Sequence, residues 1–148
     1  MEHTMQVIAR IRSEFPTKFG IPRQSGLVPE TRATIVFEPE YRNPDALRGL
    51  EGFSHLWLIR PNPIGLSCVR LEKICPTEDR GTVLLVSGAD LMDGTPIFDI
   101  KPYIPYADAH PEALEGFTAQ AGDYLLDVVF PPELEELIPQ ERRAALRG

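Results

Sequence analysis

Apolar and polar residues alternate along much of the chain in short stretches, as they do in strands that bury one face. Within residues 65–74, for example, Leu66, Leu71 and Ile74 are apolar, while Arg70 and Lys73 are charged. Residues 82–87 are nearly all apolar, which is typical of a strand buried on both faces. The pattern predicts strands at residues 6–12, 31–37, 54–59, 65–74, 82–87, 97–104 and 124–130.

Turn-forming residues separate these stretches. Fifteen prolines and eleven glycines leave little room for long helices. Residues 44–50 are predicted to form a helical turn, and residues 15–29 a loop. Many short strands with turn signals between them indicate an all-β barrel or sandwich, and closing a barrel also removes exposed edges. The fold class we predict is all-β, a single-sheeted β-barrel with short helical segments.

The C-terminal part of the chain has a different pattern. Leu134, Leu137 and Ile138 have helical spacing, and Pro139 interrupts it. We therefore expect a barrel domain over residues 1–130 and the start of a small C-terminal extension over residues 131–148.

Composition narrows the class of protein. The chain has 148 residues, of which 43% are hydrophobic and 25% charged, as in ordinary globular domains. No apolar run approaches the roughly 20 residues of a membrane helix, and the first residues do not resemble a secretion signal. These features predict a cytoplasmic protein without membrane contact. The net charge of −7 argues mildly against a broad nucleic-acid surface but leaves room for a local basic face.

The cysteines and histidines predict neither a disulfide nor a metal site. Cys68 and Cys75 are seven residues apart on one predicted strand, so we expect buried, reduced thiols on opposite faces. His3, His55 and His110 do not add a recognisable zinc-ligand spacing. For His55, between apolar residues, a hydrogen-bonded core role is favoured over a catalytic one.

Residues 91–108 carry the densest mixture of turn formers and polar side chains. Asp93 and Gly94 predict a tight turn with exposed amides. Pro96, Pro102 and Pro105 exclude a helix here. This segment is typical of the wall of a site, although turn capping by aspartate would also account for Asp90, Asp93 and Asp99. Asp99 and Lys101 are expected next to the core, where they would form an ion pair.

Two further loops carry groups that suit ligand binding. Arg23 and Gln24 follow Pro22 in a rigid loop, and a forked guanidinium there suits a carboxylate or phosphate. A solvated loop arginine is an equally good reading. Asn62 lies between two prolines in a loop whose fixed carbonyls and amides suit recognition of an adenine edge, although a plain structural turn explains it as well.

Taken together, four motifs resemble the TsaA-like (YaeB/VirR-type) family in sequence order and over nearly the whole chain. They are GIPRQ at 20–24, LEGFSHLW at 50–57, RPNPIGLS at 60–67 and DGTPIFDIKPYIPYAD at 93–108. The resemblance implies a homodimeric single-sheeted barrel that uses S-adenosyl-L-methionine to methylate tRNA, at N6 of threonylcarbamoyladenosine next to the anticodon. It implies donor binding by Pro22, Arg23, Gln24, Leu66, Met92, Asp93, Gly94 and Thr95.

The resemblance has one break. In the family, a few tens of residues with further donor-binding side chains separate the Leu-Trp-Leu-Ile strand from Arg-Pro-Asn-Pro, whereas here Ile59 is followed directly by Arg60. Either the segment is deleted or the printed sequence omits a mobile loop. Since losing a strand is hard to reconcile with a closed barrel, we expect missing residues between 59 and 60.

Residue type and position give candidates for the chemistry. The acceptor nitrogen must lose a proton, and Asp90, Asp108 and Tyr103 are possible proton acceptors. Lys101 is a candidate for stabilising negative charge on the carbamoyl group or binding the threonyl carboxylate, a role for which Arg23 competes. Asn62 is a further catalytic candidate. The alternative function is a non-catalytic β-barrel protein that binds tRNA or an adenine ligand.

Overall fold

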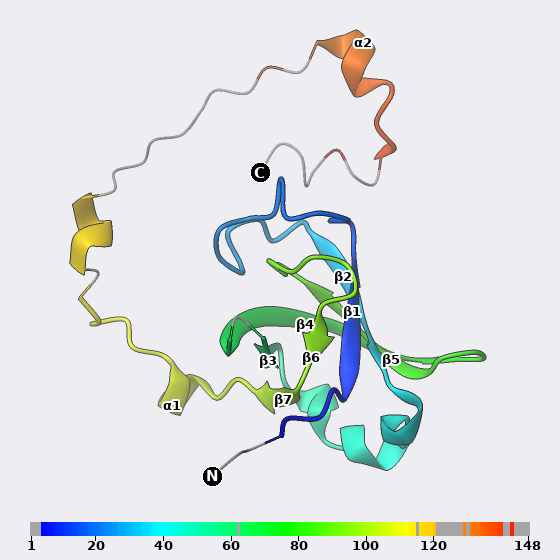
Figure 1. Ribbon diagram of the computed structural model, residues 1–148. Helices are drawn as coiled ribbons and strands as arrows, with labels where there is room; N and C mark the ends of the chain where they lie inside the picture. Colours follow the sequence, from blue (N-terminus) through cyan, green and yellow to red (C-terminus); the bar gives the residue numbers. More distant parts are fainter. Residues whose placement is uncertain are drawn as a thin grey trace. The chain divides into compact units, whose positions relative to one another are not determined.

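The computed structural model describes residues 4–61, 63–114, 116–120, 129, 131–140 and 143. It divides into two units, Met1–Tyr103 and Ile104–Arg147, which are described separately here (Figure 1). None of the helices in the described ranges has both the length and the apolar character needed to cross a bilayer.

The first unit is built on one antiparallel sheet. Its strands follow the order β6-β1-β2-β5-β4-β3-β7 across the sheet. They span Ala9–Ser13 (β1), Arg32–Phe37 (β2), His55–Arg60 (β3), Gly65–Thr77 (β4), Gly81–Ser87 (β5), Pro96–Ile97 (β6) and Asp99–Pro102 (β7).

The two outermost strands, β6 and β7, are separated in sequence only by Phe98. β6 pairs with β1 and β7 pairs with β3. The Phe98 amide donates to the Ile59 carbonyl at 2.8 Å, and the Ile8 amide donates to the Ile97 carbonyl at 2.9 Å. Consecutive residues therefore join the two ends of the sheet, which curls into a nearly closed barrel. This confirms the predicted single-sheeted β-barrel.

Side-chain alternation fills the interior of the barrel. In β1, Ala9 and Ile11 are fully buried, while Arg10 and Arg12 are exposed. Residues from the other strands complete the core, chiefly Ile35, Leu56, Leu58, Val69, Leu84, Val86 and Ile97. Burying each large aliphatic side chain stabilises the fold by about 1.5–3 kcal/mol. β5 is buried on both faces, as its apolar sequence predicted.

The predicted strands are present with modest shifts. The segment predicted at 97–104 is divided by Phe98 into β6 and β7. β4 is longer than predicted and carries a bulge between Leu71 and Lys73. The predicted helical turn near residue 44 is present as 3-10 helices at Pro44–Leu47 and Leu50–Gly52, after another at Pro39–Tyr41. The predicted strand at 124–130 lies almost wholly outside the described residues.

Two details of β4 differ from the prediction for its cysteines. Cys68 and Cys75 are half-buried, not buried. Cys68 lies between Ser67 and Val69, whose side chains point into the core, so its own points away. The bulge adds a residue between the two cysteines and so breaks the alternation on which the prediction of opposite faces relied.

The described residues of the second unit form short elements. α1 spans Pro105–Asp108, a 3-10 helix spans Gly116–Gln120, and α2 spans Pro132–Glu135. Prolines begin both α-helices, where their missing amide has no cost. The predicted helical start of the C-terminal segment is thus present. The predicted boundary at residue 130 stays a prediction, because residues 121–128 lie outside the described part.

Candidate functional site

A broad pocket of about 670 Å³ opens where three segments of the barrel unit meet. They are the loop after β1, the hairpin between β3 and β4, and the segment that follows β5. The volume is within the usual range for small-molecule sites. Its lining residues are Lys18, Ile21, Pro22, Arg23, Arg60, Pro61, Pro63, Asp90, Leu91, Met92 and Thr95.

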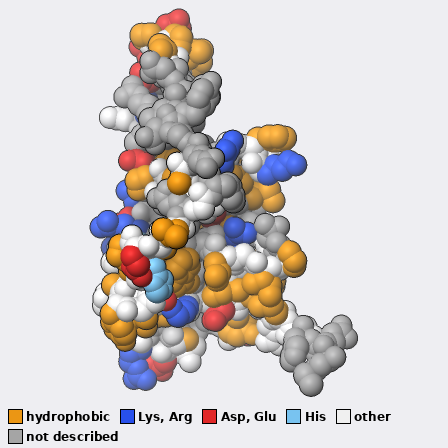
Figure 2. Space-filling model, turned by 90° about the vertical axis from the view of Figure 1, so that its left-hand side faces the viewer, with side chains coloured by type: hydrophobic (Ala, Val, Ile, Leu, Met, Phe, Trp, Pro, Cys, Tyr) orange, Lys and Arg blue, Asp and Glu red, His pale blue; other side chains and the backbone are white. Residues whose placement is uncertain are grey.

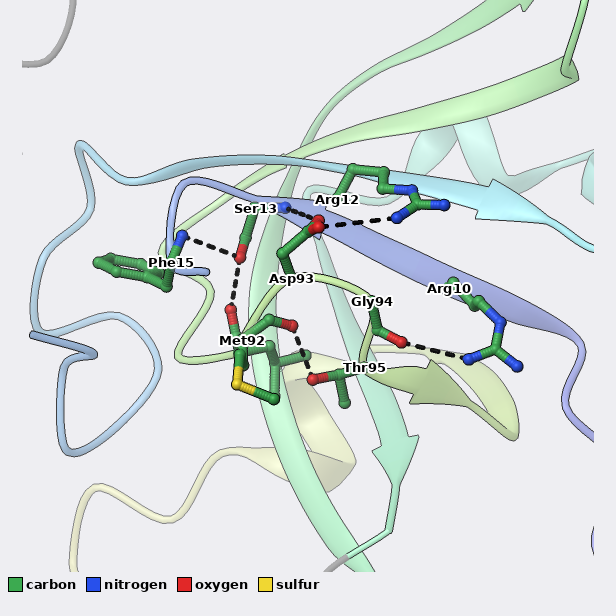
Figure 3. A network of polar contacts seen from close by, with 9 residues as sticks. Arg10, Arg12, Ser13, Phe15, Met92, Asp93, Gly94 and Thr95 are labelled. Carbon is green, nitrogen blue, oxygen red and sulfur yellow. Dashed lines mark hydrogen bonds and ion pairs between the residues drawn. The ribbon is translucent and has the colours of Figure 1, made fainter. Parts of the chain in front are cut away.

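The turn at residues 93–95 is fastened to β1 and the residues after it (Figure 3). The Asp93 amide donates to the Phe15 carbonyl at 2.8 Å, and the Gly94 amide donates to the Ile11 carbonyl at 2.9 Å. Gly94 has φ of 79°, the left-handed conformation that favours glycine. The prediction that these two amides are exposed was wrong, because they hold the turn in place.

The Asp93 carboxylate is also engaged in holding the turn. Its Oδ1 accepts from the Ser13 amide at 3.1 Å, and its Oδ2 lies 3.6 Å from Arg12 Nη1. Thr95 Oγ1 donates to the Met92 carbonyl at 2.7 Å within the turn. The turn that places Met92 and Thr95 on the pocket wall is therefore rigid.

A buried polar network lies on another part of the pocket wall. Arg60 Nε donates to Ser67 Oγ at 3.0 Å, and Ser67 Oγ donates to Asp90 Oδ1 at 2.6 Å. Arg60 Nη2 lies 3.7 Å from Asp90 Oδ2. The Arg60 and Asp90 side chains are only 18% and 8% exposed, and Ser67 is fully buried. The network joins the end of β3, the start of β4 and the segment after β5.

Reasoning from the sequence did not single out Arg60 or Ser67 individually. The signal that could have found them is the short connection between the predicted strands at 54–59 and 65–74. A hairpin there pairs Arg60 with Gly65 and brings Arg60 close to Ser67. The acidic partner, Asp90, is distant in sequence and was proposed for a different role.

The pocket brings together several of the predicted site residues. Pro22, Arg23, Asp90, Met92 and Thr95 all line it. The predicted loops at 22–24 and 93–95 thus belong to one cavity.

The other predicted donor-binding residues do not line this cavity. Gln24 is exposed beside Arg23, and Leu66 is 61% exposed next to Ser67. Asp93 and Gly94 belong to the turn that carries Thr95. Large exposed apolar side chains occur next to lining residues, on the loops at Phe19 and Ile64 and at the start of β4 at Leu66. In the view of Figure 2, hydrophobic side chains lie at several places on the surface, with basic and acidic ones among them.

Lys101 and Tyr103 do not line the pocket. Lys101 pairs with Trp57 across the β3–β7 ladder. The Tyr103 ring packs 5.8 Å from Trp57 and 6.1 Å from His55, measured between ring centroids. These contacts involve the start of β3, whereas Arg60 is at its other end. Within one barrel unit, the structure therefore does not bring these two candidates to the pocket.

The remaining candidates have separate surroundings. His55 is half-buried, and its Nδ1 lies 2.9 Å from Ser54 Oγ, in line with a hydrogen-bonded structural role. Asp99 Oδ1 accepts from the Ile100 amide at 2.9 Å. Asp108 belongs to the second unit and accepts from the Ile104 amide at 2.8 Å. Asn62 lies outside the described residues.

Ile59 and Arg60 are consecutive residues of β3, and the barrel closes with the residues of the printed sequence. The expectation of missing residues between Ile59 and Arg60 stays a prediction.

An antiparallel barrel with a ligand-sized pocket among its loops differs from the parallel, glycine-rich nucleotide-binding folds. The family model for the tRNA-methyltransferase O N-terminal domain matches residues 10–60 and 58–109. A tRNA (adenine(37)-N6)-methyltransferase of Escherichia coli is 34% identical over 172 residues, which cover 92% of this chain and 73% of that protein. The chain therefore belongs to the tRNA-methyltransferase O N-terminal domain family, which confirms the resemblance to TsaA-like proteins.

Proteins of Pseudomonas aeruginosa are also similar. A putative S-adenosylmethionine-dependent methyltransferase, RcsF, is 39% identical over 151 residues, covering 78% of this chain and 63% of that protein. The crystal structure of TrmO from Pseudomonas aeruginosa matches with a TM-score of 0.69 and 43% identity, covering 79% of this chain and 63% of that one. The chain thus spans slightly less than two thirds of these two relatives.

The comparisons also bear on the junction at residues 59 and 60. The two stretches matched by the family model meet at residues 58–60. The alignment with the Escherichia coli protein is longer than this chain, so it contains positions that the chain lacks. The first observation agrees with a break in the family pattern at residues 58–60, and the second shows that the chain lacks positions present in that relative.

Proposed function

We propose that this chain is an S-adenosylmethionine-dependent methyltransferase that modifies N6 of adenosine 37 in tRNA, in its threonylcarbamoyl form. The observation that carries the proposal is the pocket, which joins the loops at 22–24 and 90–95 in a member of this family. The names of the Escherichia coli and Pseudomonas relatives support the reaction and the donor. The homodimer implied by the resemblance and the cytoplasmic location predicted from composition belong to the same proposal.

The pocket fits the methyl donor chemically. Ile21, Pro22, Pro61, Leu91 and Met92 give it apolar walls for an adenine ring and a methylthio group. Cationic side chains on the same walls suit the carboxylate of the amino-acid part; they are Lys18, Arg23 and Arg60. Bound S-adenosylmethionine would supply an activated methyl group.

The charge arrangement suits methyl transfer from a sulfonium. A free carboxylate beside the positive sulfur would stabilise the ground state more than the transition state, because the charge disappears in the reaction. Asp90, which lines the pocket, is paired with Arg60, and Asp93, in the turn beside it, is paired with Arg12. The rigid 93–95 turn and the prolines hold the walls in fixed positions, which favours an in-line approach of the acceptor nitrogen.

Both oxygens of the Asp90 carboxylate already have partners. Its Oδ1 accepts a hydrogen bond from Ser67 Oγ, and its Oδ2 faces Arg60, so the carboxylate is engaged within the pocket wall. Lys101, Tyr103 and Asn62 remain proposed for the acceptor side. Lys101→Met separates the roles: if donor affinity and activity both stay at wild-type values, Lys101 takes no part.

The second candidate is a non-catalytic adenine-ligand- or tRNA-binding barrel. It is favoured by the engagement of Asp90, the only proposed proton acceptor among the described lining residues. Transfer of labelled methyl from S-adenosylmethionine to tRNA with and without the threonylcarbamoyl group decides between the two. Transfer only to the modified tRNA supports the enzyme. S-adenosylhomocysteine binding without any transfer supports the binder.

A further inference from the structure

Arg60 differs from the other cations of the pocket in how firmly it is held. Its side chain is 18% exposed, fixed through Nε to Ser67 and faced by Asp90. Lys18 and Arg23 are on exposed loop positions. A cation that is already immobile loses little side-chain entropy when an anion binds to it, so Arg60 is the best prepared of the three.

Among the described residues, the contacts of Arg60 leave part of its guanidinium available. The hydrogen bond to Ser67 uses Nε, and the 3.7 Å separation of Nη2 from Asp90 Oδ2 is an ion pair too long for a hydrogen bond. The N–H groups of Nη1 and Nη2 can still pair with two oxygens of a carboxylate. Arg60 lines the pocket, so a ligand in the pocket can reach these groups.

We infer that Arg60, clamped by Ser67 and Asp90, is the residue that binds a carboxylate in this pocket. The inference depends on the proposed function, in which two molecules carry a carboxylate: the amino-acid part of the donor and the threonyl group of the nucleotide. Ser67 and Asp90 are positioning residues for Arg60. They fix its orientation and balance its charge before the ligand arrives.

Two ligands that differ in the carboxylate test the inference. S-adenosylhomocysteine has the amino-acid part, and methylthioadenosine lacks it. If Arg60 binds the donor, Arg60→Gln weakens S-adenosylhomocysteine binding roughly tenfold or more, the loss expected for a charge-assisted hydrogen bond, and leaves methylthioadenosine binding unchanged. If Arg60 binds the nucleotide, both affinities stay unchanged and KM for threonylcarbamoyl-modified tRNA rises by a similar factor.

Matched variants guard against loss of structure. Arg60→Lys keeps the charge but lacks the fork, so it should lose part of the same affinity. Arg80→Gln is the control, because Arg80 pairs with Asp79 between β4 and β5 and does not line the pocket. Thermal unfolding of each variant shows that it is folded.

The remaining results overturn the inference. Unchanged affinities together with an unchanged KM in Arg60→Gln would show that Arg60 binds no carboxylate. An equal loss for both ligands would show that Arg60 only shapes the pocket. Wild-type protein that binds neither ligand and transfers no methyl would instead overturn the proposed function.

Discussion

Gly65 and Arg60 face each other across the β3–β4 hairpin, and a Cβ on residue 65 would lie 2.5 Å from Arg60 Nη1. Only glycine therefore leaves room for the guanidinium in its present place. We expect Gly65→Ala to push Arg60 away from Ser67 and Asp90 and to lower the free energy of unfolding by about 1–3 kcal/mol. Urea unfolding measures the stability, and calorimetry with S-adenosylhomocysteine measures the effect on the pocket.

A second glycine provides the control for that experiment. Gly52 has no atom near the position of its missing Cβ, and its φ is not in the left-handed range. Gly52→Ala should therefore leave stability and binding close to wild type. Wild-type stability and binding in Gly65→Ala as well would show that Arg60 can move without consequence.

The Asp93 carboxylate should stabilise the fold because it accepts a hydrogen bond from the Ser13 amide. Asp93→Ala leaves that partly buried amide without its partner, which lowers the free energy of unfolding by about 1–3 kcal/mol. Asp93→Asn retains an oxygen acceptor and loses only the ion pair with Arg12, so its loss should stay below about 1 kcal/mol. If urea unfolding shows equal losses of stability in Asp93→Ala and Asp93→Asn, the loss comes from the ion pair with Arg12 and not from the hydrogen bond with Ser13.

Glu72 should make stability depend on acidity. A hydrogen bond from Ser87 lowers the pKa of this carboxyl, and Arg32 and Arg70 lower it further against a smaller rise from desolvation. Its folded pKa is thus below the unfolded value of about 4.3. The stabilisation is present above the unfolded value and is lost as pH falls through the folded one.

Comparison of the wild type with Glu72→Gln tests this dependence. At neutral pH the variant should be less stable by under about 1 kcal/mol, because the carboxylate is partly exposed. Between about pH 5 and pH 3 the difference should shrink, since protonation removes the advantage of the wild type. A difference that stays constant over this range in urea unfolding would exclude a lowered pKa at Glu72.

Substitutions at two leucines should distinguish an effect on folding from an effect on ligand binding. Leu58 is fully buried in β3, so Leu58→Ala should lower the free energy of unfolding by about 2–5 kcal/mol. Leu66 is 61% exposed and is proposed to contact the donor. Leu66→Ala should leave stability within about 0.5 kcal/mol and weaken S-adenosylhomocysteine binding. Unchanged binding in Leu66→Ala would remove this residue from the site.

The barrel could be predicted from the sequence because its signal is local. Alternation in β1 and the apolar run in β5 mark their buried faces regardless of what pairs with them. The closure at Phe98 could not be predicted, because the residues on either side of it continue one apolar-polar pattern. Only the pairing partners, β1 on one side and β3 on the other, divide that pattern into β6 and β7.

The loops of the site could be predicted from the sequence, but the contacts between distant segments could not. Pro22, Arg23 and the turn around Gly94 were found as rigid polar loops, and the pocket contains them or lies beside them. The ion pair between Arg60 and Asp90 depends on how three separate segments fold together, which spacing along the chain does not contain. The same holds for the amides of the 93–95 turn, which looked exposed because their acceptors come from distant residues.

The pairing of β1 with β6 has a consequence for biosynthesis. β1 leaves the ribosome well before β6, so one of its edges has no sheet partner until Pro96 and Ile97 follow. Protein synthesis adds about 5–20 residues per second, so this edge stays unpaired for several seconds. An open edge can pair with another nascent chain. The exposed arginines of β1, Arg10 and Arg12, carry charge that opposes such pairing during this interval.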